Sequence, residues 1–357
     1  MSAADLSAAD LNSADPNSAD LSSADPSVGT RPVAPARAAR LRPRGLAWLM
    51  WRQNRLLLRV WLVLLLAAVV AAPFLRAGMV SFISGHHIAG CAEISMDPAC
   101  QNPSTQQAVS DFRGTYGTFL KGLGALLLLV LPAGFGAGLG APLLAQELET
   151  GTWKLALAQS VGRDRWVAAK LLTAALIGSL GAAVPALLLH WLWQPSANDV
   201  SGIGWYSLEF FGSGGPVLVA TVLLAIAVGA LAGVVLRRVL PAMAVTLGLV
   251  WLAQWALAVV RPHLWAWNTE VVDPSSLPNS VWGFGQGYLT PDGHRLPSDH
   301  CSAAVDYQSC SANLRGVTDL HHAADYWPLQ LVESGICLAV AAALTALTVR
   351  WARRRFG

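Results

Sequence analysis

The stretch PVLVATVLLAIAVGALAGVVLRRVLPAMAVTLGLVWLAQWALAVV, residues 216–260, decides the fold class of this chain. Its two apolar runs, 216–236 and 239–260, are each long enough as a helix to cross a hydrocarbon core of roughly 30 Å, which takes about 20 residues. Only Arg237 and Arg238 separate the two runs. The stretch therefore predicts two membrane-spanning helices joined in a tight antiparallel hairpin.

Four other apolar runs have the same length and character. They cover residues 56–75, 119–144, 171–193 and 329–349. Only 13% of the 357 residues are charged, against roughly 25% in soluble domains. The net charge of +3 is too small to indicate a nucleic-acid partner. The sequence predicts an all-α polytopic membrane protein, with six transmembrane helices in residues 45–357 and the lipid bilayer around them.

Arginine and lysine residues predict the side of the membrane on which each loop lies. Six spans put both termini on one side, and placing them inside puts 18 of the 24 basic residues inside and six outside. Cytoplasmic loops of membrane proteins carry such an excess of Lys and Arg. We therefore expect both termini in the cytoplasm, a location in the cell membrane, and outer loops at about residues 76–118, 194–215 and 261–328.

Four of the five cysteines lie in the expected outer loops as two equally spaced pairs. Cys91 and Cys100 belong to the first loop, and Cys301 and Cys310 to the third. The outer face is oxidising, and neither pair has the C-x2-C spacing of many zinc sites, so two loop disulfides are the favoured prediction. Metal binding is the alternative, because the same loops hold six histidines: His86, His87, His294, His300, His321 and His322.

The first 44 residues differ in composition from the rest. Residues 1–26 are an acidic repeat with a period of five, and residues 31–45 are basic and broken by proline. The repeat resembles pentapeptide-repeat solenoids but is too short to bury a core, so residues 1–44 are predicted to be a disordered tail and linker. Residues 45–55 combine tryptophan with arginine, which predicts a short interfacial helix ahead of the first span.

Few polar side chains interrupt the spans. They are Lys121, His190, Gln254 and Glu333. Polar groups inside a membrane are costly and often functional, but all four are expected near the outer face, where snorkelling or local pairing would explain them.

The second span also contains four alternate glycines: Gly134, Gly136, Gly138 and Gly140. They form two interleaved small-xxx-small pairs, which favour close helix packing in membranes. Because Pro132 comes just before them, a bend is the alternative interpretation.

The connection between the second and third spans is QELETGTWKLALAQSVGRDRWVAAK, residues 146–170, which is far longer than a turn requires. Glu147 and Glu149 come first, Gly151 can end a helix, and Thr152 can cap the next one. A second break at residues 160–162 precedes a basic entry into the third span. The pattern predicts a short amphipathic helix between two joints, with one face for the membrane and one for a partner.

This connection resembles that of the permease subunits of type-2 ABC transporters, actinobacterial members in particular. The resemblance rests on the order E-x-E-x-G-T, an apolar half-turn, a Ser/Arg-rich joint and a basic residue opening the next span, and it extends over residues 45–357. It implies a coupling helix that docks on a separate ABC ATPase. The residues of this ATPase-coupling segment are Glu147, Glu149, Gly151, Thr152, Trp153, Arg163, Arg165 and Trp166. It also implies ATP-driven export, and a homodimer or a second permease.

The chain has no G-x-x-x-x-G-K-[ST] loop, so ATP and magnesium are expected on the partner, with no cofactor and no catalytic residue in this chain. The apolar spans favour a hydrophobic or amphipathic substrate. Three alternatives stay open: a membrane-embedded metal-dependent enzyme that uses the outer histidines, a proton-coupled carrier that uses Glu333, and a scaffold or sensor without transport.

Overall fold

The computed structural model describes residues 46–91, 98–151, 163–197, 199–272, 277–301, 310 and 313–355. These residues belong to one unit, Arg44–Gly357. Side chains are described from residue 59 onward, except at residues 163–165 and 355. The tail and linker predicted for residues 1–44 lie outside the described residues and stay a prediction.

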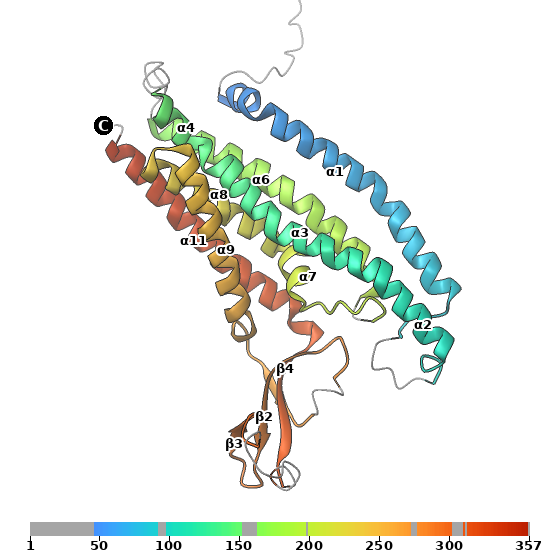
Figure 1. The fold of residues 1–357 in the computed structure, drawn as a ribbon. Coiled ribbons are helices and arrows are strands. Elements are labelled where there is room, and N and C mark those ends of the chain that lie inside the picture. The colour runs from blue at the N-terminus through green and yellow to red at the C-terminus, as the bar shows by residue number, and fades with distance from the viewer. Residues whose placement is uncertain are drawn as a thin grey trace, which may run out of the picture. The chain divides into compact units, whose positions relative to one another are not determined.

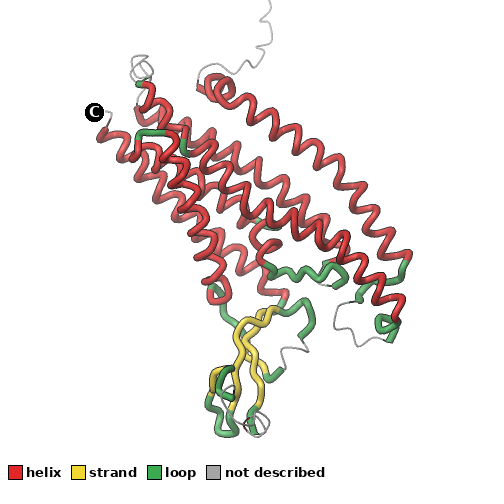
Figure 2. The backbone as a smooth tube through the Cα atoms, viewed as in Figure 1, coloured by secondary structure: helices red, strands yellow, loops and turns green. Residues whose placement is uncertain are grey.

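Six helical stretches of the described chain are long and apolar enough to cross a membrane, which confirms the predicted fold class (Figures 1 and 2). The first is α1 (Leu46–Gly85). The second joins α2 (Pro103–Phe112), η1 (Arg113–Gly117), α3 (Thr118–Phe135), η2 (Gly136–Gly140) and α4 (Pro142–Thr150), of which η1 and η2 are π-helical. The other four are α6 (Arg163–Trp193), α8 (Pro216–Leu236), α9 (Val239–Val260) and α11 (Tyr326–Arg355).

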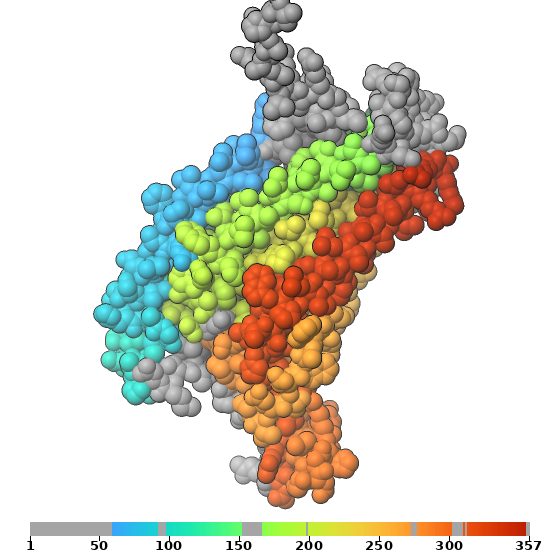
Figure 3. All heavy atoms as spheres, turned by 180° about the vertical axis from the view of Figure 1, so that it is seen from behind, coloured from blue at the N-terminus to red at the C-terminus, as the bar shows by residue number. Residues whose placement is uncertain are grey.

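Helix α8 lies at the centre of the bundle. It packs against α11, α6, α9 and η2, and 78% of its most apolar stretch is buried. From behind, α8 is visible only as a narrow yellow strip between α6 and the red α11 (Figure 3). The corresponding stretches of α1 and α9 are only 6% and 11% buried, so these two helices lie at the outside of the bundle.

Small residues bring η2 and α8 into backbone contact. A Cβ atom added at Gly140 would lie 2.7 Å from the carbonyl oxygen of Ile226, and one added at Gly136 would lie 2.9 Å from that of Ala225. Gly134 instead is exposed, and a Cβ atom there would meet nothing. Of the two predicted glycine pairs, Gly136 and Gly140 therefore form a packing surface against α8.

The first outer connection is shorter than the predicted loop at residues 76–118. Helix α1 continues to residue 85 and α2 begins at residue 103, so the connection covers residues 86–102. The two helices extend beyond their apolar runs because their ends pack through aromatic rings. Phe82 lies 5.8 Å from Phe112, and Phe112 lies 5.1 Å from Tyr116, measured between ring centroids. The apolar run indicates where lipid contact ends, whereas this packing decides where the helices end.

The residues expected to form a separate interfacial helix continue into the first span. Helix α1 is unbroken from Leu46, because no glycine or proline interrupts residues 46–72. In Figure 1 its first turns are seen nearly end-on, whereas the remainder runs across the view, so α1 bends near its start. Contact of these first turns with a lipid surface stays a prediction.

The second outer connection folds back against the bundle. It contains η3 (Gln194–Ser196) and the short helix α7 (Leu208–Ser213), which packs against α3, α8 and α6. Phe210 and Phe211 of α7 are buried. The side-chain amide of Gln330 in α11 donates a hydrogen bond of 2.7 Å to the carbonyl oxygen of Phe211. These contacts fix α7 at the start of α8.

The connection between α9 and α11 contains a β-sheet that the sequence does not predict. After η4 (Arg261–His263) come β1 (Asn268–Glu270), β2 (Trp282–Leu289), β3 (Arg295–Pro297) and β4 (Arg315–His321), followed by η6 (Ala323–Asp325). The strands are antiparallel in the order β1-β4-β2-β3. This sheet is an addition to the helical fold.

A buried acid links three strands of the sheet. Asp319 on β4 accepts hydrogen bonds of 2.8 and 2.5 Å from the Arg295 guanidinium on β3, and one of 2.6 Å from the Thr269 hydroxyl on β1. The Arg295 hydrogen bonds lower the pKa of Asp319, and burial opposes them. Asp319 therefore connects both edge strands to the inner strand β4, β3 through an ion pair and β1 through a hydrogen bond.

Candidate functional site

The two ends of the helical bundle hold the candidate sites. The hairpin end is the end with the Arg237–Arg238 turn, where α4 also ends and α6 begins (Figure 1). The sheet end is the end at which η4 and the four strands follow α9. The distribution of basic residues predicts that the hairpin end faces the cytoplasm.

The predicted coupling segment leaves the bundle at the hairpin end. Helix α4 ends at Thr150, and Gly151 follows with φ +71°, the left-handed conformation of a glycine helix cap. Residues 152–162, which include Thr152 and Trp153, lie outside the described residues, so their helix stays a prediction. Helix α6 begins at Arg163, and the side chains of Arg163 and Arg165 are not described.

Glu147 joins the two helices that border the coupling segment. Its carboxylate forms a buried ion pair with the Lys170 ammonium on α6. Lys170 also donates a hydrogen bond of 3.1 Å to the carbonyl oxygen of Leu143, and its nitrogen lies 4.4 Å from the centre of the Trp166 ring. A buried charge needs such partners, because removing one of them leaves the other desolvated and unpaired. The pair therefore fixes α4 against α6.

Glu149 joins the coupling segment to a different helix. Its Oε2 atom accepts a hydrogen bond of 2.9 Å from the backbone N–H of Val239, the first residue of α9. Arg238 occupies the N-cap position of α9 without a side-chain hydrogen bond, so Glu149 supplies the acceptor that a capping side chain provides elsewhere. A carboxylate there also complements the positive end of the helix dipole.

The two acids of the segment thus have different partners. Glu147 contacts α6, and Glu149 contacts α9. Both acids are expected to belong to the ATPase-coupling segment, and the structure shows that both also contact the membrane helices. Docking of the segment on an ATPase stays a prediction.

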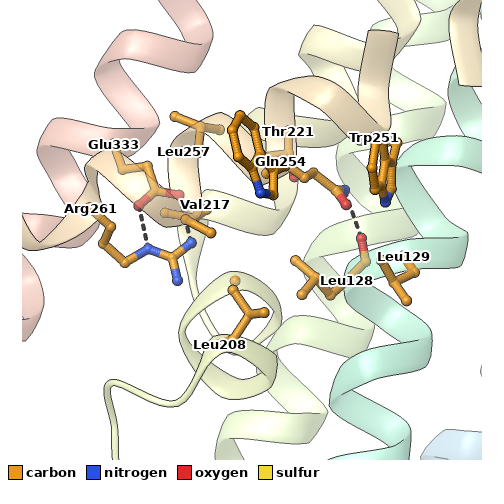
Figure 4. A pocket seen from close by; sticks show the side chains of 13 residues that line it. Leu128, Leu129, Leu208, Val217, Thr221, Trp251, Gln254, Leu257, Arg261 and Glu333 are labelled. Carbon is orange, nitrogen blue, oxygen red and sulfur yellow. Dashed lines mark hydrogen bonds and ion pairs between the residues drawn. The ribbon is translucent and has the colours of Figure 1, made fainter. Parts of the chain in front are cut away.

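A cavity of about 160 Å³ lies toward the sheet end of the bundle. Its lining comes from α3, α7, α8, α9, η4 and α11, and most of it is apolar (Figure 4). Trp251 and Trp255 border it on α9, Leu128 and Leu129 on α3, and Leu208 on α7. The cavity can therefore accept an apolar group of modest size.

Polar groups line two parts of this cavity (Figure 4). The Gln254 amide donates a hydrogen bond of 2.8 Å to the carbonyl oxygen of Leu128, which joins α9 to α3. Arg261 pairs with Glu333 of α11 through two hydrogen bonds, Nε to Oε2 at 2.8 Å and Nη2 to Oε1 at 3.0 Å. The Arg261 guanidinium also lies 4.3 Å from the centre of the Phe211 ring. The pair is neutral as a unit, so the cavity presents polarity without net charge.

The structure places the other two polar residues of the spans apart from these contacts. Lys121 is exposed. The His190 ring lies 5.8 Å from Phe210 and 6.0 Å from Trp193, in an aromatic group beside α7. The four residues expected near the outer face therefore divide into Gln254 and Glu333, which line the cavity, and the other two, which do not.

The structure pairs the outer cysteines as Cys91–Cys100 and Cys301–Cys310, and Cys337 is free and buried in α11. Among the described residues, no group of three or more His, Cys, Asp or Glu side chains is placed to hold a metal ion. His321 lies 2.9 Å from the carbonyl oxygen of Pro262, and His322 lies 3.2 Å from the Glu270 carboxylate. These histidines connect the sheet to the ends of α9 and α11.

Sequence reasoning missed the partners of the charged groups. Lys170 was read as a basic residue that opens the third span, and Arg261 as a charge on one side of the membrane, although each has an acid at the neighbouring end of an adjacent span. Antiparallel spans two and three bring Glu147 and Lys170 together, and spans five and six bring Arg261 and Glu333 together. Pairing charges across span ends would have found both.

Comparison with known families agrees with this arrangement. The family model described as ABC-2 membrane transporter related matches residues 61–261, more than half of the chain. The match includes most of α1, all of the coupling segment and α9, and ends at Arg261 of the ion pair. No curated protein and no solved structure matches the chain. The chain therefore belongs to the ABC-2 membrane transporter related family, whose members are membrane subunits of ABC transporters.

Proposed function

We propose that this chain is the permease subunit of an ATP-driven exporter in the cytoplasmic membrane, and that a separate ATPase subunit supplies its energy. The family match and the six apolar helices support a transport subunit. The sequence has no Walker loop, which supports ATP binding by a separate subunit. A homodimer or a second permease completes the pathway, and both termini lie in the cytoplasm.

The observation that carries the proposal is the way in which the coupling segment is attached. Its first end is joined to α6 by Glu147 and to α9 by Glu149, and its second end continues directly into α6. A segment bordered by such contacts can transmit a displacement into the bundle, because its ends cannot move without the membrane helices. An ordinary connection needs only a few residues, as the two-residue turn between α8 and α9 demonstrates.

The proposed substrate is hydrophobic or amphipathic. The cavity toward the sheet end supports this, because leucine and tryptophan form most of its wall and its charged residues neutralise each other. A strongly charged molecule would find no unpaired counter-charge there. Export as the direction of transport follows from the family resemblance.

Docking of the ATPase can be tested on the full-length chain. The tagged chain is purified from its native membranes into nanodiscs, and mass spectrometry identifies any co-purifying subunit that contains a Walker loop. Truncation of a tryptophan anchor at an interface typically costs about 2 kcal/mol, roughly 30-fold in affinity. We expect Trp153→Ala to lose the ATPase.

Trp327→Ala is the matched control, because this tryptophan is 56% exposed and lies at the opposite end of the bundle. It should retain as much ATPase as the wild type does. Equal recovery with Trp153→Ala and the wild type would show that the segment is not the docking element. A wild-type preparation without any ATPase would refute the proposed function itself.

A further inference from the structure

Helix α9 packs against the bundle less extensively than its neighbours do. Only 11% of its most apolar stretch is buried. Leu240, Trp251 and Trp255 on α9 are 78, 65 and 57% exposed. One face of the helix packs on α8, η2, α4 and α3, and specific polar contacts lie at its two ends.

One of these contacts lies at the hairpin end. Glu149 accepts a hydrogen bond from the backbone N–H of Val239. It lies in the last turn of α4, two residues before the cap residue Gly151. Pro241, two residues further into α9, has no backbone N–H. Few N–H groups in the first turn of α9 are therefore left without an intrahelical acceptor. A displacement of the start of the coupling segment would reach the first turn of α9 through this side chain, beside the apolar packing of α4 on the same turn.

The other contacts lie at the sheet end, about 33 Å away along a helix of this length. Gln254 holds α9 to α3, and Arg261, the residue after α9, holds it to α11 through Glu333. Both residues line the cavity. A rotation or tilt of α9 would therefore change the shape of the cavity.

We propose that Glu149 is a positioning residue for transport, which transmits movement of the coupling segment to α9 and thereby opens and closes the outer cavity. The inference rests on the proposed function and deepens it by naming the helix that moves. Glu147 has the complementary role, because its buried pair with Lys170 holds the coupling segment to α6. Helix α8, which is mostly buried, provides the fixed reference for this movement.

Contact with lipid alone does not explain these observations. Lipid accounts for an exposed apolar face on α9, but it does not require a carboxylate on the first N–H of that helix. Nor does docking on an ATPase require it, since a docking acid would be directed away from the membrane helices.

The test uses the full-length chain with its co-purified ATPase in nanodiscs, compared with ADP and after trapping with ATP and vanadate. Hydrogen exchange is followed in α9 and η4. Glu149→Ala removes the acceptor, Glu149→Gln keeps one, and Asp111→Ala removes an exposed acid at the other end of the second span as the control. Glu149→Met, which lacks the acceptor at similar length, is the second variant if Glu149→Ala does not fold.

We expect trapping to change exchange at the sheet end of α9 in the wild type, in Glu149→Gln and in Asp111→Ala. Glu149→Ala and Glu149→Met should retain the ATPase but lose most of this change. Without nucleotide, the Val239 amide should exchange about fivefold faster in these two variants, as expected for loss of a helix cap.

A nucleotide-dependent change of wild-type size in both variants would overturn the role of Glu149 and leave the proposed function intact. The absence of any such change in the wild type would overturn the movement of α9. A preparation in which mass spectrometry finds no ATPase would overturn the proposed function and this inference together.

Discussion

Helices α8 and α9 are adjacent in the chain and joined by two residues, yet they are held by different forces. Both are long and apolar, and both qualify as membrane spans. Helix α8 has 78% of its apolar stretch buried, whereas α9 has 11%. Packing of small residues against η2 holds α8, whereas α9 packs through one face only and has polar contacts at its two ends. A transport protein needs both a rigid reference and a movable element, and this hairpin provides one of each.

The largest effect on stability is expected from breaking the ion pair between Arg261, the residue after α9, and Glu333 of α11. Glu333→Leu leaves the Arg261 guanidinium buried without its partner, and breaking a buried pair typically costs about 3–5 kcal/mol. We expect a large decrease in the thermal stability of the purified protein. The double variant Arg261→Met with Glu333→Leu should recover much of it, because two apolar groups leave no charge unpaired. A single variant as stable as the wild type would show that the pair does not hold α9.

The second prediction compares the effect on stability of one methyl group added to each helix. A Cβ atom at Gly229 of α8 would lie 2.7 Å from the backbone nitrogen of Ala141, whereas one at Gly248 of α9 would meet nothing within 4 Å. Gly229→Ala should cost about 1–3 kcal/mol through overpacking, and Gly248→Ala should be neutral or stabilising by up to about 1 kcal/mol. Thermal unfolding in detergent measures both. Similar results for the two variants would refute the contrast between the helices.

The smallest expected effect is on the stability of the sheet that follows α9, and this effect depends on pH. The Arg295 hydrogen bonds lower the pKa of Asp319 below its ordinary value of 3.8. The ion pair therefore contributes its full stability above pH 3.8, and this contribution is lost as the pH falls toward the lowered pKa of the folded state. Arg295 is 42% exposed, so solvent screening keeps the effect small.

The measurement for this pair is sheet unfolding followed by tryptophan fluorescence as the pH is lowered. We expect the wild type to lose stability in this acid range and Asp319→Asn to lose less. An identical pH dependence in the two proteins would exclude Asp319 as the titrating group.

The sequence predicts the helices well because apolar length is a local property. Runs such as 216–236 and 239–260 are visible without knowledge of their neighbours. It does not distinguish α8 from α9, because burial depends on which helix lies at the centre of the bundle. The sheet was missed for a related reason: β2, WGFGQGYL, alternates glycine with larger residues and does not show the alternation of polar and apolar residues typical of a half-buried strand.

The sequence indicates which residues belong to the candidate sites but not which residues they contact. The sequence indicated that residues 146–170 are unusual, and it singled out Glu147, Glu149, Gln254 and Glu333. It did not indicate that Glu149 would cap α9, because that contact joins residues 90 positions apart. Hydrogen bonds between distant segments follow from the tertiary arrangement, which one sequence does not reveal.

The proposed movement of α9 relative to α8 is tested most directly by two distances, measured in the full complex with its ATPase. Spin labels are placed at Leu240 of α9 or at Val235 of α8, each paired with a label at Leu172 of α6, in a Cys337→Ala background. All three labelled positions are exposed.

Double electron–electron resonance then compares the ADP state with the ATP–vanadate state. We predict that the distance from α6 to α9 changes on trapping, that the distance from α6 to α8 stays constant, and that Glu149→Ala abolishes the change. If both distances change, or if neither changes, α9 does not move relative to α8 as proposed.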